Sequence, residues 1–328
     1  LRFSDFSTSL DHNLRNGLLV GPSTTPSLEK TITRTCERLF LSRSAVSVFV
    51  HASSQIQATC QSISEQECIV QLSSALVNLL TEDEISFVVG HELGHHTLCH
   101  FMTAGQHESL ELHMQRRAQE ISVDRLGLVG CSSLNVATSA MIKTVSGLND
   151  NHLKLDVRGF LDQAKALKNP IHGEGYLNTH PSILMRCRAL LWFSQISHEI
   201  FEKHEELELR LSDVNKRVET ELIKFVEAPT IDFIKSVTQG LSMWMAAQHV
   251  LSKGVFNKTD QSRFEALYGV DNLKKFKSLV NNLSKKDVTR FVEGKIVLHT
   301  GKLNSLVPNS YKEHIADLER ELLNSFKT

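Results

Sequence analysis

Two kinds of hydrophobic pattern divide this chain. Residues 46–60 are rich in β-branched and apolar side chains and contain no Gly or Pro, which predicts one strand, or two strands with a bend near residues 52–54. Residues 68–72 have the same character and predict a further strand, followed by a short helix or a connection over residues 73–80. The sequence therefore predicts a small sheet in the first third of the chain.

Apolar positions at spacings of three and four dominate the remainder and predict helices. Thr81 and Glu84 have the spacing of a capping box, in which each side chain bonds the other residue's backbone N–H, so one helix begins there. Ser27 is expected to cap an earlier helix, and Ser132 or Ser133 a later one. The helices predicted before residue 150 cover residues 27–40, 81–102, 106–128 and 132–147.

A long apolar stripe begins after Pro181 and continues to Phe225, with one gap at His204. It predicts a long helix, kinked near Ser212, that ends at Pro229, because the residue before a proline disfavours helical geometry. The stripe fits a helix packed on its own domain, which we favour, or a coiled-coil arm. Shorter helices are predicted beyond it, over residues 230–252, 260–268, 271–283, 285–293 and 310–326.

These elements predict an α+β fold in which a mostly helical core contains a small sheet and an all-helical domain follows. Residues 1–26 are polar and carry turn-forming pairs, so we expect a loop or a loosely docked N-terminal arm. The core domain is expected over residues 27–200 and the helical C-terminal domain over residues 201–328, with a long connecting helix as far as about residue 228.

Composition adds limits on partners and location. The chain has 328 residues, which suits one large domain or two ordinary ones, and 41% of them are hydrophobic. A formal net charge of −1 gives no general electrostatic reason to expect nucleic acid or an anionic membrane as a partner. The longest apolar runs fall far short of the roughly 18–20 residues that a transmembrane helix needs, so we expect a soluble protein without a transmembrane segment.

The cysteines bear on the redox environment. There are six, none lies after Cys187, and no Cys-x-x-Cys pair occurs. This spacing fits neither a zinc-finger framework nor a small disulfide scaffold, so buried free thiols in a reducing compartment are expected, which favours the cytoplasm. The sequence starts at Leu1, and removal of an upstream signal would instead imply a periplasmic or membrane-anchored location.

The strongest chemical signal is a His-Glu-x-x-His pattern formed by His91, Glu92 and His95. Two histidines four residues apart lie on one face of a helix, one turn apart, so their ring nitrogens can converge on one metal ion. Glu92 can then reach a water held by that metal and act as general base. The pattern predicts a zinc site on the helix that begins at Thr81.

A zinc site of this kind needs one more protein ligand. The three-histidine alternative requires Gly at position 98 and His at position 101, but the chain has Leu98 and Phe101. The other option is a glutamate on a following helix. Glu120 supplies it, with Glu108 and Glu111 as alternative ligands.

Three further residues near these candidate ligands are not expected to bind the metal themselves. Asp124 lies one turn after the proposed glutamate ligand, where it can bond a ligand imidazole from behind and fix its tautomer. His96 lies about 100° around the helix from His95 and is not expected to bind the metal. His100 is expected to pack or to hydrogen-bond beneath the site.

These motifs resemble those of the HtpX-like and CAAX-prenyl-protease-like zinc metallopeptidases, which are gluzincins with a soluble core of the minigluzincin type. The resemblance covers roughly residues 30–195 and implies a zincin-type core. It rests on motifs in the expected order, namely His91-Glu92-Leu93-Gly94-His95, His100, Glu120 to Asp124, and Thr179-His180-Pro181-Ser182 with Arg186.

The resemblance implies a role for each matching residue. The ligands of one zinc ion correspond to His91, His95 and Glu120. Glu92 would activate the attacking water. His180 would stabilise the oxyanion of the tetrahedral intermediate, and Arg186 would hold the carboxylate of the site or orient the substrate.

The resemblance also implies an edge strand above the zinc helix, to which a peptide substrate adds as a further strand. Residues 54–60 occupy the matching position, and the expected substrate contacts are Gln55, Ile56, Gln57 and Ala58. Many relatives have an Asn-Ala pair where this chain has Gln57-Ala58, which leaves the register of the substrate open. The membrane-embedded relatives have flanking transmembrane helices, and this sequence has none.

The sequence thus favours a soluble zinc endopeptidase that acts on a protein or peptide. A second interpretation is a latent or vestigial peptidase that acts as a regulatory module and binds a protein partner through its helical C-terminal domain. In that case the polar loop over residues 165–178 would cover the site. A third interpretation, an assembly factor that uses the long helix, is not distinguished from these by sequence.

Overall fold

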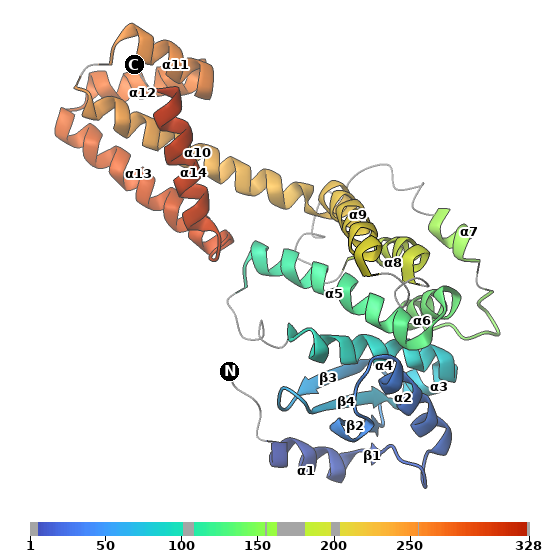
Figure 1. Cartoon of the computed structure of the whole chain (residues 1–328). Coiled ribbons are helices and arrows are strands. Elements are labelled where there is room, and N and C mark those ends of the chain that lie inside the picture. Colours follow the sequence, from blue (N-terminus) through green and yellow to red (C-terminus); the bar gives the residue numbers. More distant parts are fainter. Residues whose placement is uncertain are drawn as a thin grey trace. The chain divides into compact units, whose positions relative to one another are not determined.

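The structure is a computed structural model, and it divides into two compact units (Figure 1). The first comprises Leu1–Gln106 and Met114–Val226, and the second His107–His113 and Glu227–Thr328. The residues that the structure describes are 6–100, 108–154, 156–162, 181–197, 204–254 and 256–326.

The first unit contains one four-stranded sheet with the order β1-β2-β4-β3. The short β1 (Leu18–Leu19) pairs antiparallel with β2 (Val46–His51), and β2 runs parallel to β4 (Cys68–Ser73). At the other edge, β3 (Ala58–Ser62) is antiparallel to β4, with Cys60 opposite Val70. The predicted break after β2 is confirmed, but the edge strand begins at Ala58 and not at residue 54.

Helix α4 (Glu82–Thr97) lies on one face of the sheet and α1 (Phe6–Asn16) on the other (Figure 1). The prediction of a loop is therefore wrong for α1. Leu10 packs against the sheet residue Phe49, and the buried Asn13 accepts a hydrogen bond from Gln71 at 2.7 Å. Tertiary packing thus stabilises a helix that local turn signals disfavour, and the Asn-Gly pair marks its end.

The remaining helices of the first unit follow the predicted order. Ser133 caps α6 by accepting a hydrogen bond from the Val136 backbone N–H, and Gly147 ends that helix with φ +70°. Helix α4 ends earlier than predicted, at Thr97, and Cys99 beyond it has φ +56°. The other helices are α2 (Pro26–Arg38), α3 (Ser74–Leu79), α5 (Leu110–Cys131), α6 (Leu134–Ser146) and α7 (Val157–Asp162).

The predicted single long helix is wrong. Helix α8 (Ile183–Ser197) ends before α9 (His204–Leu222) begins at the gap in the apolar stripe, and a π-helical turn follows over Ile223–Glu227. Apolar residues of both helices share one cluster with Ile121 of α5, so α9 folds back on its own unit. The apolar stripe is therefore a packing face within this unit. Helix α9 is continuous through residue 212.

The second unit is all-helical, as predicted. Its helices are α10 (Ala228–Ser252), α11 (Lys258–Tyr268), α12 (Val270–Asn282), α13 (Lys285–Leu306) and α14 (Tyr311–Ser325). Helix α13 continues past Gly294, where a helix end was predicted, because that glycine keeps helical geometry on an open surface. The buried apolar residues of the second unit form two clusters. One includes Phe264 and Phe276, and the other includes Leu241 and Leu303.

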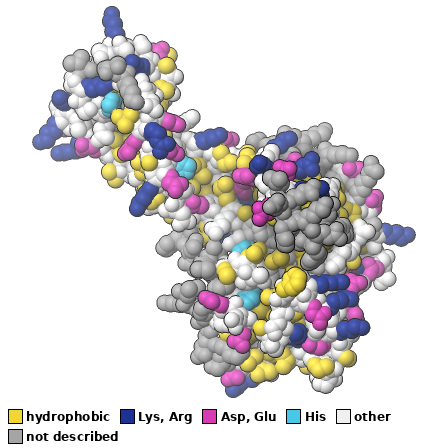
Figure 2. Space-filling model, in the orientation of Figure 1, with side chains coloured by type: hydrophobic (Ala, Val, Ile, Leu, Met, Phe, Trp, Pro, Cys, Tyr) yellow, Lys and Arg dark blue, Asp and Glu magenta, His cyan; other side chains and the backbone are white. Residues whose placement is uncertain are grey.

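The surface carries both charge signs. Figure 2 shows Lys and Arg side chains interspersed with Asp and Glu on the face in view, which agrees with the near-zero net charge. Among the described residues, no helix is both long and apolar enough to cross a membrane.

Candidate metal centre

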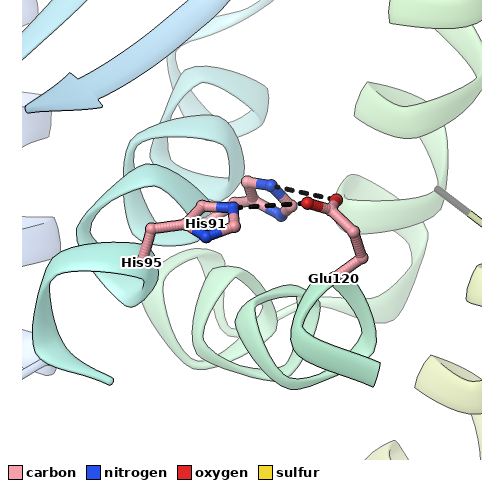
Figure 3. Close-up of side chains that lie close together, drawn as sticks. All are labelled: His91, His95 and Glu120. Carbon is pink, nitrogen blue, oxygen red and sulfur yellow. Dashed lines mark ion pairs between the residues drawn. The ribbon is translucent and has the colours of Figure 1, made fainter. Parts of the chain in front are cut away.

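Helix α4 supplies the two histidines of the centre. The predicted capping box is present: the Thr81 hydroxyl accepts from the Glu84 backbone N–H, and the Glu84 carboxylate accepts from the Thr81 backbone N–H at 2.8 Å. The cap fixes the start of the helix. His91 and His95 follow on one face, with ring centroids 5.1 Å apart, and point toward α5 (Figure 3).

Glycines bring α5 close to this face of α4. A Cβ atom added at Gly90 would lie 3.1 Å from the Cα of Gly127, and one added at Gly94 would lie 3.1 Å from the Val123 side chain. A Cβ at Gly127 would lie 2.8 Å from the Phe87 ring. At Gly90 the nearest atoms of α5 are backbone atoms, whereas side chains of Val123 and Phe87 pack against Gly94 and Gly127, so the glycines allow the two helices to approach closely.

This crossing places Glu120 of α5 opposite both histidines (Figure 3). Its Oε2 lies 3.6 Å from the Nε2 of His91, and its Oε1 lies 3.4 Å from the Nε2 of His95. One ligand atom from each of the three residues lies within 4.8 Å of the others. Among the described residues, this is the group whose donors could hold a metal ion, and its carboxylate is Glu120, not Glu108 or Glu111.

Asp124 lies behind His91, where the sequence predicted it. Its Oδ1 accepts a hydrogen bond from the Nδ1 of His91 at 2.9 Å. Arg186 of α8 donates to the same carboxylate through Nε at 2.7 Å and a terminal nitrogen at 2.6 Å. Burial alone would raise the pKa of Asp124, but the Arg186 guanidinium and the His91 bond lower it to about 2. The carboxylate is therefore ionised and can only accept.

The hydrogen bond that Asp124 accepts from His91 determines which ring nitrogen of His91 can bind a metal. Because Nδ1 carries the proton that Asp124 accepts, Nε2 presents its lone pair on the side of Glu120. Burial lowers the pKa of His91, and the Asp124 bond more than offsets this, so the pKa is raised. Arg186 in turn has a raised pKa, because Asp124 outweighs the effect of burial.

Glu92 lies among these groups on the same helix. Burial raises its pKa, and the two histidines of the centre oppose that rise. A partly buried carboxylate with a raised pKa beside a candidate metal site is suited to take and release a proton near neutral pH.

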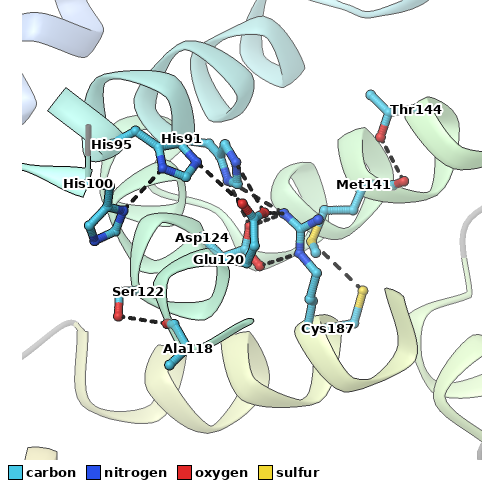
Figure 4. Close-up of polar contacts among 11 residues, drawn as sticks. His91, His95, His100, Ala118, Glu120, Ser122, Asp124, Met141, Thr144 and Cys187 are labelled. Atoms are coloured by element: carbon cyan, nitrogen blue, oxygen red, sulfur yellow. Dashed lines mark hydrogen bonds and ion pairs between the residues drawn. The ribbon is translucent and has the colours of Figure 1, made fainter. Parts of the chain in front are cut away.

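The second histidine has a different neighbour. The Nδ1 atoms of His95 and His100 lie 3.1 Å apart, and burial, aided by the nearby His95, lowers the pKa of His100 to about 4 (Figure 4). His96 points elsewhere: its Nδ1 lies 2.8 Å from the hydroxyl of Ser62 on β3. Neither His96 nor His100 belongs to the ligand group.

The other predicted site residues lie on or before β3, or outside the described residues. Ala58 is the first residue of β3, while Gln55, Ile56 and Gln57 lie in the connection before it. The Gln57 carbonyl accepts from the Ser73 backbone N–H at 3.0 Å. His180 and the loop over residues 165–178 lie outside the described residues.

Two imidazole nitrogens and one carboxylate oxygen form the donor set of a three-ligand metal site. Both Nε2 atoms face the carboxylate, and both Nδ1 atoms have their own partners. The residues present therefore fit a metal ion. This His-His-Glu group on an α+β fold is therefore a candidate metal centre.

Comparison with known proteins indicates the class of protein. Residues 22–113 match Peptidase family M48, a span that contains strands β2, β3 and β4 and helix α4 and ends before Glu120. The plastoglobule-localized metallopeptidase 48, chloroplastic, of Arabidopsis thaliana is 25% identical over 207 residues, which are 54% of this chain and 60% of that protein. The chain thus spans about 60% of the length of this curated relative. No solved structure matches it. The resemblance to M48-type metallopeptidases is therefore confirmed, and it points to a metal-dependent peptidase.

Proposed function

We propose that this protein is a zinc-dependent endopeptidase whose centre is formed by His91, His95 and Glu120. The observation that carries the proposal is the convergence of these three side chains within 4.8 Å, with Glu92 on the same helix. The M48 match over residues 22–113, which include α4 with both histidines, supports the same reaction class.

A bound zinc ion would polarise the scissile carbonyl and lower the pKa of the attacking water. Glu92 accepts a proton from that water and passes it to the leaving amine, which its raised pKa favours. Arg186 compensates the charge of Asp124, and Asp124 holds the ring of His91. His180 is proposed to donate to the developing oxyanion, on the family resemblance alone.

A peptide substrate is proposed to bind along β3. This strand forms one edge of the sheet, and among the described residues no strand pairs with its outer side. An extended peptide can add to such an edge through main-chain hydrogen bonds. Cys60 of β3 lies near enough to Glu92 to be influenced by its charge, so a peptide on this edge would run past the general base.

The decisive experiment compares the full chain with its Glu92→Gln variant, using zinc analysis and digestion of a peptide library with and without a chelator. The parent is expected to hold one zinc ion and to cleave internal bonds, and the chelator should abolish cleavage. Glu92→Gln should retain zinc but lose at least about a hundredfold in rate, because it removes the proton acceptor.

A matched control is Glu65→Gln, the same change at an exposed position in the turn between β3 and β4. It should cleave as the parent does. A Glu92→Gln variant as active as the parent would contradict the proposed mechanism. A parent that binds zinc but cleaves nothing would favour the regulatory interpretation.

A further inference from the structure

We propose that His100 is a positioning residue for the metal centre: it accepts the Nδ1 proton of His95 and so directs the Nε2 of His95 toward Glu120. The inference rests on the proposed metal site. It assigns His100 a role through His95, without contact to the metal or the substrate.

The contact between the two rings is close. Their Nδ1 atoms lie 3.1 Å apart, with ring centroids at 5.2 Å and an interplanar angle of 72°. Two imidazole nitrogens at this distance share one proton, so one donates and the other accepts. If a metal takes the Nε2 lone pair of a neutral His95, the proton of that ring is on Nδ1. His100 must then accept at Nδ1 and carry its own proton on Nε2.

The backbone after α4 turns so that the His100 ring contacts the His95 ring. In a continued α-helix, the residue five positions after His95 would lie about 140° around the axis, on another face. Helix α4 instead ends at Thr97, and Cys99 takes a left-handed conformation with φ +56°. A non-glycine residue rarely adopts this conformation, because its Cβ approaches the following carbonyl oxygen. The turn at Cys99 brings the ring of His100 back against His95.

The two histidines of the centre are held by different chemical groups. Behind His91 is Asp124, an anion whose side chain is 1% exposed and which is paired with Arg186. The group behind His95 is an imidazole, and His95 is the more exposed ligand, at 28% against 13% for His91. A carboxylate behind both would add negative charge beside Glu120. A neutral acceptor orients His95 without that repulsion.

The test measures zinc affinity of the full chain by competition with a chromophoric chelator, for the parent, His100→Ala and His100→Gln. Loss of a partner behind a ligand typically weakens metal binding by about 10–100-fold. We expect a loss of that size in His100→Ala and a partial recovery in His100→Gln, which restores an acceptor. Thr97→Ala, an exposed change in the last turn of α4, should bind zinc as the parent does.

A second measurement follows the proton itself. In the zinc-loaded parent, nuclear magnetic resonance should detect the Nδ1–H of His95 as a proton that exchanges slowly with water. In His100→Leu, which fills the space but offers no acceptor, it should exchange faster, a change that a packing role would not produce. Equal zinc affinity in the parent and His100→Ala would overturn the inference alone. A parent that binds no zinc would overturn both the inference and the proposed function.

Discussion

Arg186 donates two hydrogen bonds to the carboxylate of Asp124, through Nε at 2.7 Å and a terminal nitrogen at 2.6 Å. This fork joins α8 to α5 directly behind His91. The Asp124 side chain is 1% exposed, so its charge is compensated by protein groups and not by water. The orientation of His91 therefore depends on a residue that lies far along the sequence from both α4 and α5.

Replacing Arg186 with lysine should weaken metal binding by about 10–100-fold, because the ammonium group retains the charge but not the two-pronged geometry. The measurement is zinc competition against a chromophoric chelator. Arg188→Lys is the matched control: this arginine is on the same helix and forms a 3.1 Å ion pair with Glu221. If both variants bind zinc equally well, Arg186 does not act through the centre.

Gly127→Ala should separate the two ligand helices. The added Cβ would lie 2.8 Å from the Phe87 ring and 2.9 Å from the Phe87 carbonyl oxygen, closer than real contacts allow. Overpacking of this kind costs about 1–3 kcal/mol, more than the roughly 1 kcal/mol gained from helix propensity. Chemical denaturation should show that loss, together with weaker zinc binding.

The control for this change is Gly21→Ala, where no atom lies within 4 Å of the new Cβ and φ is not left-handed. It should leave stability and zinc binding unchanged. If Gly127→Ala instead raised the stability, the close crossing of α4 and α5 would be wrong.

Lys143→Met should destabilise the first unit. The Lys143 side chain is 1% exposed and forms ion pairs with Glu84 at 2.8 Å and with Asp150 at 2.7 Å. Removing it leaves the buried Glu84 carboxylate without its cation, which typically costs about 3–5 kcal/mol. Urea denaturation of the full chain, monitored for the first unit, measures the loss.

The two partners of Lys143 provide the controls. Asp150→Asn should cost less than about 1 kcal/mol, because the Asp150 side chain is 69% exposed. The double variant Lys143→Met with Glu84→Gln should be more stable than Lys143→Met alone, since it removes the uncompensated charge. Equal destabilisation by all three variants would argue against a charge effect.

The parts of the site that the sequence predicted best are those in which residue spacing alone determines the geometry. The helical period places His91 and His95 on one face, and the capping box at Thr81 and Glu84 fixes where that helix starts. Glu120 and Asp124 are also one turn apart, so they were predictable as a pair. Their order relative to the histidines carried the resemblance to a metallopeptidase.

Contacts that depend on tertiary packing were not predictable in this way. Helix α9 packs beside α8 in one apolar cluster, which the periodicity of a continuous stripe does not reveal. Helix α1 forms because Leu10 and Asn13 bind the outer face of the sheet. The turn at Cys99 carries no glycine, so nothing local in the sequence signals it.

One sequence signal for the crossing was available. Gly90, Gly94, Gly127 and Gly130 recur on α4 and α5, and glycines inside helices are costly unless something passes close to them. Small residues on both predicted helices would have indicated a backbone contact between them. The identity of the contact partners still required the structure.

Helices α4 and α5 meet at Gly90 and Gly127 with no side chain between them. Their backbones are already near van der Waals contact, so neither helix can move closer to the other. His91 directly follows Gly90, and the separation of the ligand helices therefore has a lower limit that no rotamer changes. A smaller ion would have to be reached by rotation of the Glu120 side chain, and a larger one would have to push the helices apart. Gly90 and Gly127 carry no ligand atom, but they would thus help to set the range of ionic radii that the proposed centre accepts.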